Sequence, residues 1–401
     1  MQDNEKKPAL RFKGFTDPWE QRKLGDAFER VVRKNTNNES WLPLTISAQD
    51  GLVDQITYFN NRVASRDVSN YYLVYNGEFA YNKSTSDGYP FGAVKRLDWY
   101  EKGVLSTLYI VFALKHPEKD DSDFMTVFYD TDRWHRGVAE RAAEGARNHG
   151  LLNISAEDFF DIDTTMPEDK VEQEKIGRLL KKLDTLITLH QRKYEKLVNI
   201  KKSMLDKMFP QNGVSVPEIR FKGFTDPWEQ RKLKELYFQL TERNADLLPY
   251  QKTLSVATMS FKTDGNGAAD TSLANYKRLR TGDIAFEGHT SKEFRYGRFV
   301  LNDVGDGIMS PRFSALRPLH EMPINFWKYY IHYEPIMRKV LVNSTKAGTM
   351  MNELVINEFL QESILVPSVA EQQAIGRFFK QLDTLITLHQ RKLEKLQNIK
   401  K

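Results

Sequence analysis

The stretch RFKGFTDPWEQRKL occupies residues 11–24 and returns without a single change at residues 220–233. We call each copy the entry motif. A second block, LDTLITLHQRK, occupies residues 183–193 and returns at residues 382–392. Blocks that recur in a fixed order are typical of a duplicated architecture. Each half of the chain therefore has the same order, namely entry motif, variable middle and long helix.

The helical segments carry apolar residues on a heptad, and no proline lies between Pro167 and Pro210. Further apolar residues widen the stripe, which indicates more than one partner helix. Two interpretations stay open: a spacer that separates two DNA readers, and a bundle that only joins the halves. The predicted helix interface comprises Ile176, Leu179, Leu183, Leu186, His190 and Leu197 in the first helix, and Ile375, Phe378, Leu382, Leu385, His389 and Leu396 in the second.

His190 and His389 occupy seam positions, one in each helix. A lone histidine at such a position more often sets the register of a helix pair than binds a metal or transfers a proton. We therefore predict no metal site.

The two middles share a faint frame, since residues 71–92 can be laid over residues 276–297 without a gap. The pieces GEFAY and GDIAF in this frame follow a glycine turn with strand-forming residues, and VLSTLYIVFAL at residues 104–114 predicts one buried strand. Each middle is predicted to be an α+β domain. The expected domains are 1–167 and 211–367, each a mixed α/β domain, joined by long helices over 168–210 and 368–401.

Composition excludes several functional classes. At 401 residues the chain exceeds what one hydrophobic core supports, and 40% hydrophobic with 28% charged residues is typical of a folded protein. No long apolar run or signal peptide is visible, so we expect a cytoplasmic protein. The absence of cysteine excludes thiol catalysis and cysteine-ligated metals. The net charge is only +5, and its basic excess lies in the two helices.

Signatures of catalysis are also missing. The sequence has no GxxxxGK[ST] loop, HExxH or GxSxG. Asp17-Pro18-Trp19 resembles part of an amino-methyltransferase motif but is better explained as a turn before a strand. The carboxylates and lysine at residues 168–170 stand where a helix is expected to begin.

The layout resembles the specificity (S) subunit of type I restriction-modification systems over nearly the whole chain. The copied helices carry the resemblance, with Glu172-Gln173 and Ile176-Gly177 matched by Glu371-Gln372 and Ile375-Gly376. The resemblance implies two target-recognition domains that each read half of a split DNA sequence, spaced by an antiparallel coiled coil with a pseudo-twofold repeat. It also implies two methyltransferase subunits using S-adenosylmethionine on adenine, and restriction subunits using ATP and magnesium. This chain itself is expected to be non-catalytic and to bind no cofactor.

Base reading needs Arg, Lys, Asn or Gln on loops that enter the major groove. Loops after the predicted strands offer such residues in both halves, although many will be ordinary solvated side chains. The predicted DNA-binding residues are Asn82, Lys83, Ser84, Ser86, Arg133, Arg136, Arg147 and Asn148 in the first half, and His289, Ser291, Lys292, Arg295, Arg298, Arg312 and Lys346 in the second.

Two other functions remain as alternatives. A self-contained DNA-modifying enzyme would need donor or metal motifs that the chain lacks. A non-specific architectural coiled-coil protein would show no DNA sequence preference.

Overall fold

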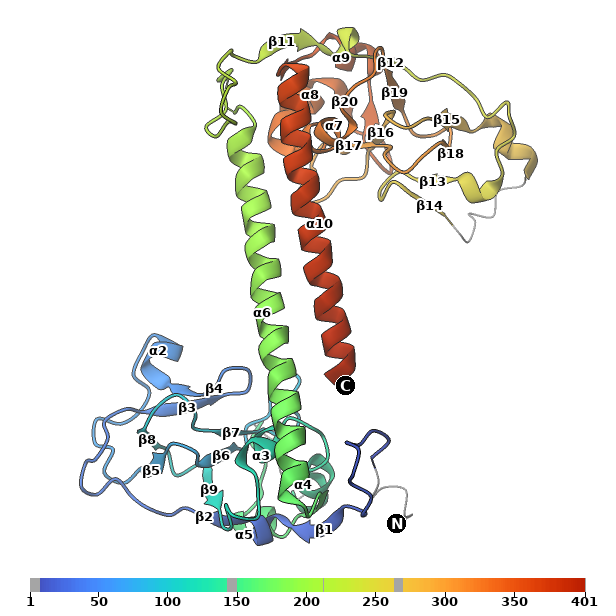
Figure 1. The fold of residues 1–401 in the computed structure, drawn as a ribbon. Coiled ribbons are helices and arrows are strands. Elements are labelled where there is room, and N and C mark those ends of the chain that lie inside the picture. The colour runs from blue at the N-terminus through green and yellow to red at the C-terminus, as the bar shows by residue number, and fades with distance from the viewer. Residues whose placement is uncertain (1–7, 143–149, 212, 263–269, 401) are drawn as a thin grey trace. The chain divides into compact units, whose positions relative to one another are not determined.

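A computed structural model describes residues 8–142, 150–211, 213–262 and 270–400. Two compact units divide the chain: unit 1 comprises Met1–Thr188 with Ile399–Lys401, and unit 2 comprises Leu189–Asn398. Both units mix strands with helices, so the predicted α+β class is confirmed (Figure 1). Two long helices, α6 (Lys170–Met208) and α10 (Val369–Lys400), follow the globular parts. Within the described ranges, no helix is both long and apolar enough to cross a membrane.

Unit 1 is built on an antiparallel four-stranded sheet with the order β2-β9-β6-β7. Three two-stranded sheets, β1-β10, β3-β4 and β5-β8, surround it. The strands are β1 (Glu20–Lys23), β2 (Phe28–Arg30), β3 (Leu44–Ser47), β4 (Gly51–Asp54), β5 (Tyr72–Tyr75), β6 (Phe79–Asn82), β7 (Ala93–Arg96), β8 (Lys102–Leu105), β9 (Ile110–Leu114) and β10 (Asp163–Met166). The helices before α6 are α1 (Leu24–Ala27), α2 (Gln55–Phe59), α3 (Ser122–Tyr129), α4 (His135–Arg141) and α5 (Ala156–Phe160).

Strand β6 is buried on both faces, because side chains alternate between two cores. Phe79 and Tyr81 point to the helices, where Tyr81 stacks on Phe159 of α5 with ring centroids 4.8 Å apart. Ala80 points instead to the core under β3, β5 and β8. The sheet thereby holds the end of β6 in a fixed place.

The prediction of one buried strand over residues 104–114 is wrong. The segment breaks into β8, which pairs with β5, and β9, which pairs with β2 and β6. A turn separates them: the amide of Tyr109 donates to the carbonyl of Ser106 at 3.2 Å, and the Ser106 hydroxyl accepts from Leu108 at 3.4 Å. Ser106 thus satisfies backbone amides outside a strand ladder, and the apolar residues on either side concealed this turn in the sequence.

Unit 2 has the same strand arrangement, with the sheet order β12-β19-β16-β17 and the pairs β11-β22, β13-β14 and β15-β18. A short pair, β20-β21, is added. Strands β15 and β16 lie in the half of the predicted frame that begins at residue 276. The strands are β11 (Glu229–Lys232), β12 (Tyr237–Gln239), β13 (Leu254–Ser255), β14 (Ser260–Phe261), β15 (Lys277–Leu279), β16 (Ile284–Glu287), β17 (Arg298–Leu301), β18 (Gly307–Met309), β19 (Ala315–Pro318), β20 (Thr345–Lys346), β21 (Glu353–Leu354) and β22 (Ser363–Val366).

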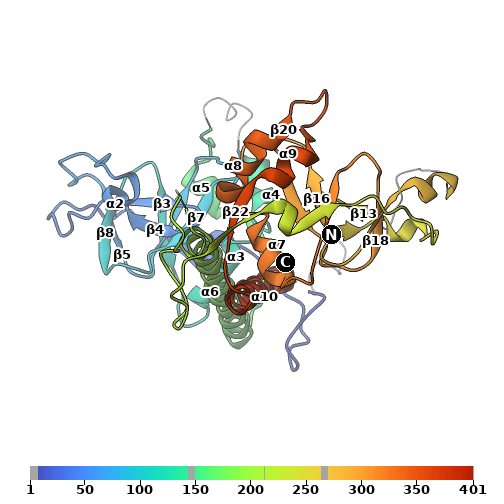
Figure 2. The ribbon, with the colours of Figure 1, turned by 90° about the horizontal axis from the view of Figure 1, so that it is seen from above.

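The core of unit 2 lies between its sheet and its helices, and α8 and α9 lie side by side (Figure 2). Phe209, just beyond the end of α6, enters this core and meets Phe326 and Tyr330 edge-on at 6.0 and 5.3 Å. The helices of this unit are α7 (Ile324–Tyr330), α8 (Glu334–Ser344) and α9 (Ile356–Gln361), with 3₁₀ turns η3 (Leu233–Glu235), η4 (Tyr250–Lys252) and η5 (Asp270–Asn275).

Helix α6 begins where the acidic segment 168–170 predicted it, since the Asp169 carboxylate accepts from the amide of Val171 at 2.7 Å. The copied Glu-Gln pair that follows ties the helix to unit 1. Glu172, buried, forms a bidentate ion pair with Arg11 of the entry motif at 2.6 and 2.7 Å. Gln173 accepts from the amide of Asp121 at 2.8 Å.

The second copy does the same inside unit 2. Glu371 pairs with Arg220 at 2.7 and 2.8 Å, and Gln372 accepts from the indole of Trp327 at 3.0 Å. One turn later, a Cβ added to Gly376 would lie 2.7 Å from the backbone nitrogen of Phe326. The copied residues are therefore those that join a helix to its own domain.

Candidate nucleic-acid interface

In unit 2, the loop after β16 is organised by a buried carboxylate that the sequence analysis did not select. Glu287, with an 8% exposed side chain, ends the strand and accepts from the amide of His289 at 3.1 Å. Its other contacts are the His289 imidazole and, at 3.6 Å, the Arg298 guanidinium. Two predicted DNA-binding residues thus share one carboxylate.

Arg298 is held on two further sides. Its guanidinium donates to the carbonyl of Ala257 at 3.0 Å, in the turn between β13 and β14. It also lies over the ring of Phe294 at 5.1 Å. With this many internal partners, Arg298 is a fixed part of the loop.

Asn352, another residue that sequence reasoning missed, connects the loop to a second segment. Its amide donates to the carbonyl of Gly288 at 2.9 Å, and its side chain donates to the carbonyl of Arg295 at 3.3 Å. The neighbouring Met351 sulfur lies 3.8 Å from Arg312. Segments around residues 288–298, 312 and 351–352 therefore meet at one place.

The other predicted DNA-binding residues of unit 2 lie at the surface. Ser291 shapes the loop, because its hydroxyl accepts from the amide of Phe294 at 3.0 Å. Lys292 and Arg295 are exposed, and neither cation has an ion-pair partner in the part of the chain that the structure describes. Lys346 is exposed in β20, where its backbone pairs with Glu353. Exposed unpaired cations are the groups that can meet phosphates or guanine edges.

In unit 1 the corresponding loop follows β6 and is less basic. Asn82 ends the strand and accepts from the amide of Ser84 at 3.0 Å. Lys83 donates to the carbonyl of Ile154 at 3.4 Å, so its ammonium group is partly engaged within the domain. Ser86 forms a turn with Tyr89, whose amide donates to it at 2.8 Å.

The remaining predictions for unit 1 concern the region of α4. Arg133 lies over the ring of Trp19 at 5.3 Å, and Arg136 forms an exposed ion pair with Glu140 at 2.8 Å. Both cations thus have partners within the unit. Arg147 and Asn148 fall outside the described residues.

A histidine packs against an aromatic residue of each loop. The sequence alone could not reveal these contacts, because the two residues of each pair are distant in the chain. His135 packs on Phe91 and His332 packs on Phe294, each with ring centroids 5.0 Å apart. Burial lowers the pKa of both imidazoles. Neutral rings therefore underlie both loops at neutral pH.

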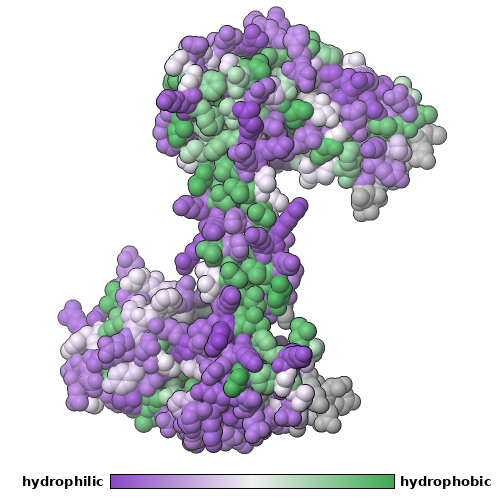
Figure 3. Space-filling view, in the orientation of Figure 1, coloured by the Kyte–Doolittle hydropathy of each residue, from purple (hydrophilic) through white to green (hydrophobic). Residues whose placement is uncertain are grey.

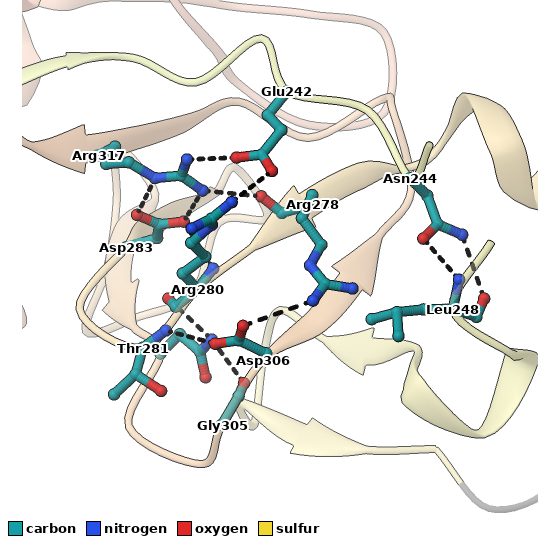
Figure 4. A network of polar contacts seen from close by, with 11 residues as sticks. Glu242, Asn244, Leu248, Arg278, Arg280, Thr281, Asp283, Gly305, Asp306 and Arg317 are labelled. Carbon is teal, nitrogen blue, oxygen red and sulfur yellow. Dashed lines mark hydrogen bonds and ion pairs between the residues drawn. The ribbon is translucent and has the colours of Figure 1, made fainter. Parts of the chain in front are cut away.

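The opposite end of β16 is anchored by the network shown in Figure 4. Arg317 forms a bidentate pair with Asp283 at 2.8 and 2.9 Å and also contacts Glu242, which binds Arg280 at 2.9 Å. Burial raises the pKa of the Asp283 carboxyl, against the opposite effect of Arg317. Nearby, the buried Asn244 closes its own loop through two hydrogen bonds to the backbone of Leu248, at 2.8 and 3.1 Å (Figure 4). The strand that presents Glu287 is thus fixed at its start.

Unit 1 fixes β6 by a simpler pair. Arg33 donates twice to Glu78, at 2.7 and 2.8 Å, and Glu78 accepts from the amide of Tyr75 at 2.8 Å. Asp283 accepts from the amide of Arg280 in the same way, at 2.7 Å. The Glu78 and Asp283 positions matched in the predicted frame therefore have the same role.

The seam histidines meet within unit 2. The Nδ1 atoms of His190 and His389 lie 2.8 Å apart, so one imidazole donates and the other accepts. Burial lowers the pKa of His190, assisted by the charges of His389, Lys392 and Lys193.

Other predicted interface residues differ in burial. Leu183, Ile375 and Leu382 are buried, whereas Leu179 and Leu385 are 47% and 43% exposed. Apolar side chains at the surface of the long helices are visible in Figure 3. Partly buried members of the predicted set are Ile176, Leu186, Leu197, Phe378 and Leu396.

Comparison with known proteins shows similarity to one family. Residues 226–398 match the family model of the type I restriction modification DNA specificity domain. The specificity subunit of the type I restriction enzyme MjaVIII from Methanocaldococcus jannaschii is 23% identical over 325 residues, which cover 75% of this chain and 72% of that protein.

A solved structure shows the same fold. The S subunit of a type I restriction-modification system from M. genitalium is 14% identical, with a TM-score of 0.53 over 98% of this chain and 96% of that chain. The HsdS subunit from Thermoanaerobacter tengcongensis is 15% identical, with a TM-score of 0.44 over 95% and 94% of the two chains. Residues 226–398 therefore match the DNA specificity domain of type I restriction-modification systems, and the chain is similar over three quarters of its length to a specificity subunit of such a system.

Proposed function

We propose that each unit reads one half of a bipartite double-stranded DNA target. The observation that carries this proposal is that one strand arrangement presents two chemically different loops, one centred on Asn82 and the other on Glu287. A shared scaffold with different loop side chains suits two readers of different sequences.

The predicted DNA-binding residues take three roles in this proposal. Lys292, Arg295 and Lys346 contact DNA directly, because they are exposed. Arg298 and His289 are oriented by Glu287. Residues Asn82 to Ser86 form the reading loop of unit 1.

Substitution of Arg295 with alanine tests a direct contact. Uniformly weaker binding to all sequences would indicate a phosphate contact, and a relaxed preference at one base pair would indicate a base contact. Unchanged binding would remove Arg295 from the interface.

The long helices are proposed to form an antiparallel coiled coil that spaces the two readers, within a pseudo-twofold internal repeat. Supporting contacts occur inside each unit at copied positions: Lys201 pairs with Asp383 at 2.6 Å in unit 2, and Lys400 pairs with Asp184 at 2.5 Å in unit 1. The pairing of His190 with His389 supports the same arrangement.

Catalysis is proposed to reside in partner subunits. Two methyltransferase subunits would bind S-adenosylmethionine and methylate adenine, and restriction subunits would use ATP and magnesium. This chain would hold none of these cofactors and would direct its partners to the target.

Methylation-sensitive sequencing tests the whole proposal. DNA from cells that express this chain with its methyltransferase partner is compared with DNA from cells that lack only this chain. A new adenine-methylated motif in two blocks with a fixed gap is expected. No new motif, with a methyltransferase shown to be active beside another specificity chain, would contradict the proposal.

Exchange of residues 24–167 for the corresponding domain of another specificity chain tests the assignment of the halves. Only one block of the methylated motif should change. A change in both blocks would show that the units do not read independently.

A further inference from the structure

Helix α2 has no buried residue, and of the residues that follow it up to position 64 only Ala64 is buried in unit 1. We call residues 55–64 the arm. Its apolar side chains face solvent: Ile56 is 38% exposed, Tyr58 and Phe59 are each 50% exposed, and Val63 is 65% exposed. Large apolar groups that gather at the surface of one short segment mark an interaction site.

The arm is a rigid element, because its backbone is closed by its own hydrogen bonds. Asp54 caps the helix by accepting from the amide of Ile56 at 2.9 Å, and Asn60 ends it with a left-handed φ of 51°. The amide of Ala64 then donates to the Gln55 side chain at 2.6 Å and closes the loop. The aromatic side chains are therefore held outward by a defined structure.

Within the arm the two aromatic rings also hold each other. Tyr58 and Phe59 meet edge-on with centroids 5.0 Å apart. This arrangement presents a rigid apolar ridge at low cost in side-chain entropy.

The arm is connected to the reading loop of unit 1 through the β3–β4 hairpin. Tyr89, which forms a turn with Ser86 of that loop, donates its hydroxyl to the carbonyl of Ala48 at 3.2 Å, in the turn before β4. Strand β4 then runs three residue steps from Gly51 to Asp54, which is about 10 Å of rise. The hairpin therefore separates the arm from its contact with Tyr89 by a length comparable to the width of a major groove, which is about 12 Å.

The polar residues of the arm favour DNA over a protein as the partner. The ten residues include one cation, Arg62, and two asparagines, Asn60 and Asn61, with no acidic residue. Amide and guanidinium groups beside apolar side chains match the grooves of a duplex, in which apolar wedges lie between base steps.

The amino-acid sequence of unit 2 lacks the aromatic residues of the arm at the corresponding point. Residues 262–275 follow the β13–β14 pair, as the arm follows the β3–β4 pair, and their sequence contains no aromatic residue. The arm is therefore specific to the first half of the chain.

We propose that the arm contacts the DNA duplex beside the half-target read by unit 1, with Tyr58 and Phe59 inserted against the bases of the adjacent groove. This inference rests on the proposed function of unit 1 as a DNA reader. It adds a contact of apolar character to a loop that has few free cations.

The test uses the purified complex of this chain with its methyltransferase subunits. The ligand is a fluorescent duplex that carries the target sequence identified by methylation-sensitive sequencing. The double variant Tyr58→Ala/Phe59→Ala should bind about tenfold more weakly, as expected for lost base–aromatic contacts. The dependence of the dissociation constant on salt should keep its slope, because no phosphate contact is removed.

A matched control is Trp99→Ala. Trp99 is 75% exposed in the same unit but lies beyond the far end of β7, away from the reading loop. Its variant should bind the target as the wild type does. Unfolding midpoints should be equal for both variants and the wild type, which separates a lost contact from a lost fold.

The outcomes distinguish a failure of the arm proposal from a failure of the proposed DNA-reading function of unit 1. Wild-type complex without sequence preference would overturn the proposed function itself. Preference in the wild type with equal affinity in the double variant would overturn the arm alone. Loss of the methyltransferase from the purified double variant would also overturn it, since the arm would then bind protein. A 2-aminopurine beside the first half-target should brighten with the wild type and not with the double variant.

Discussion

The reading loops of the two units have the same backbone frame, but the residues that begin them differ in charge. Asn82 and Glu287 end equivalent strands and accept from the amide two residues later, of Ser84 and His289 respectively. The first is a neutral amide, whereas the second is a buried carboxylate that also holds Arg298. The comparison shows that one backbone frame accepts strand-end residues of different charge, so charge can vary while the frame stays.

The frame itself depends on a glycine at the far end of each loop. Gly92 and Gly297 adopt φ values of 77° and 84°, and an added Cβ would lie 2.1 and 2.7 Å from the carbonyl oxygens of Asn82 and Glu287. Only glycine allows the chain to pass so close to the strand end.

The largest loss of stability is expected when the ion pair that fixes the start of β16 or of β6 is removed. Arg317→Met leaves Asp283 buried without its partner, and we expect a loss of about 3–5 kcal/mol of unfolding free energy. The matched Arg33→Met leaves Glu78, whose side chain is 13% exposed, and should cost less. Urea unfolding of the purified complex measures both. Equal losses would show that the two anchors do not differ in burial as the structure indicates.

Replacement of the frame glycine should have the next largest effect. Gly92→Ala places a methyl group against Asn82 and strains φ, so we expect about 2–4 kcal/mol of destabilisation. Gly51→Ala is the control, because its φ of 92° is similar but no atom lies within 4 Å of the added Cβ. Thermal unfolding should rank Gly92→Ala well below Gly51→Ala. The reverse order would contradict the close approach.

Exchange of loop charge should sharpen the comparison with a smaller effect on stability. Glu287→Gln removes charge-assisted contacts to His289 and Arg298, at about 1–2 kcal/mol of unfolding free energy, and should relax the preference in the second half-target. Asn82→Asp is the converse change and should weaken binding at the first half-target. Competition binding with half-site mutants measures both. An effect of either variant on the other half would refute separate readers.

The smallest effect is expected from pH at the His190–His389 pair. The folded pKa of His190 lies below its unfolded value, so the unfolded chain takes up protons more readily. The contribution of neutral His190 to the free energy of unfolding is fully present above the unfolded pKa of about 6.5. It decreases as the pH falls toward the folded pKa. The unfolding midpoint should be lower at pH 5.5 than at pH 7.5. The difference should shrink in His190→Gln, and an unchanged difference would assign the pH effect to other groups.

Much of the architecture could be predicted from local patterns. The duplicated blocks predicted two similar halves and both long helices, because identical neighbours and apolar periodicity are written in consecutive residues. The same reasoning failed at residues 104–114, where a polar Ser-Thr pair inside an apolar run turns the chain. Strand pairing depends on partners distant in sequence, which periodicity does not identify.

The sites show the same division. Inspection of the sequence selected exposed cations such as Arg295 and Lys292, since side-chain chemistry is a property of single residues. It could not select Glu287, Asn352 or His332, because their roles arise only where distant segments meet. By itself the sequence determined the duplication, the long helices and the lack of catalytic motifs. The tertiary structure alone decided which side chains share a carboxylate and which loops converge, because those contacts depend on long-range packing.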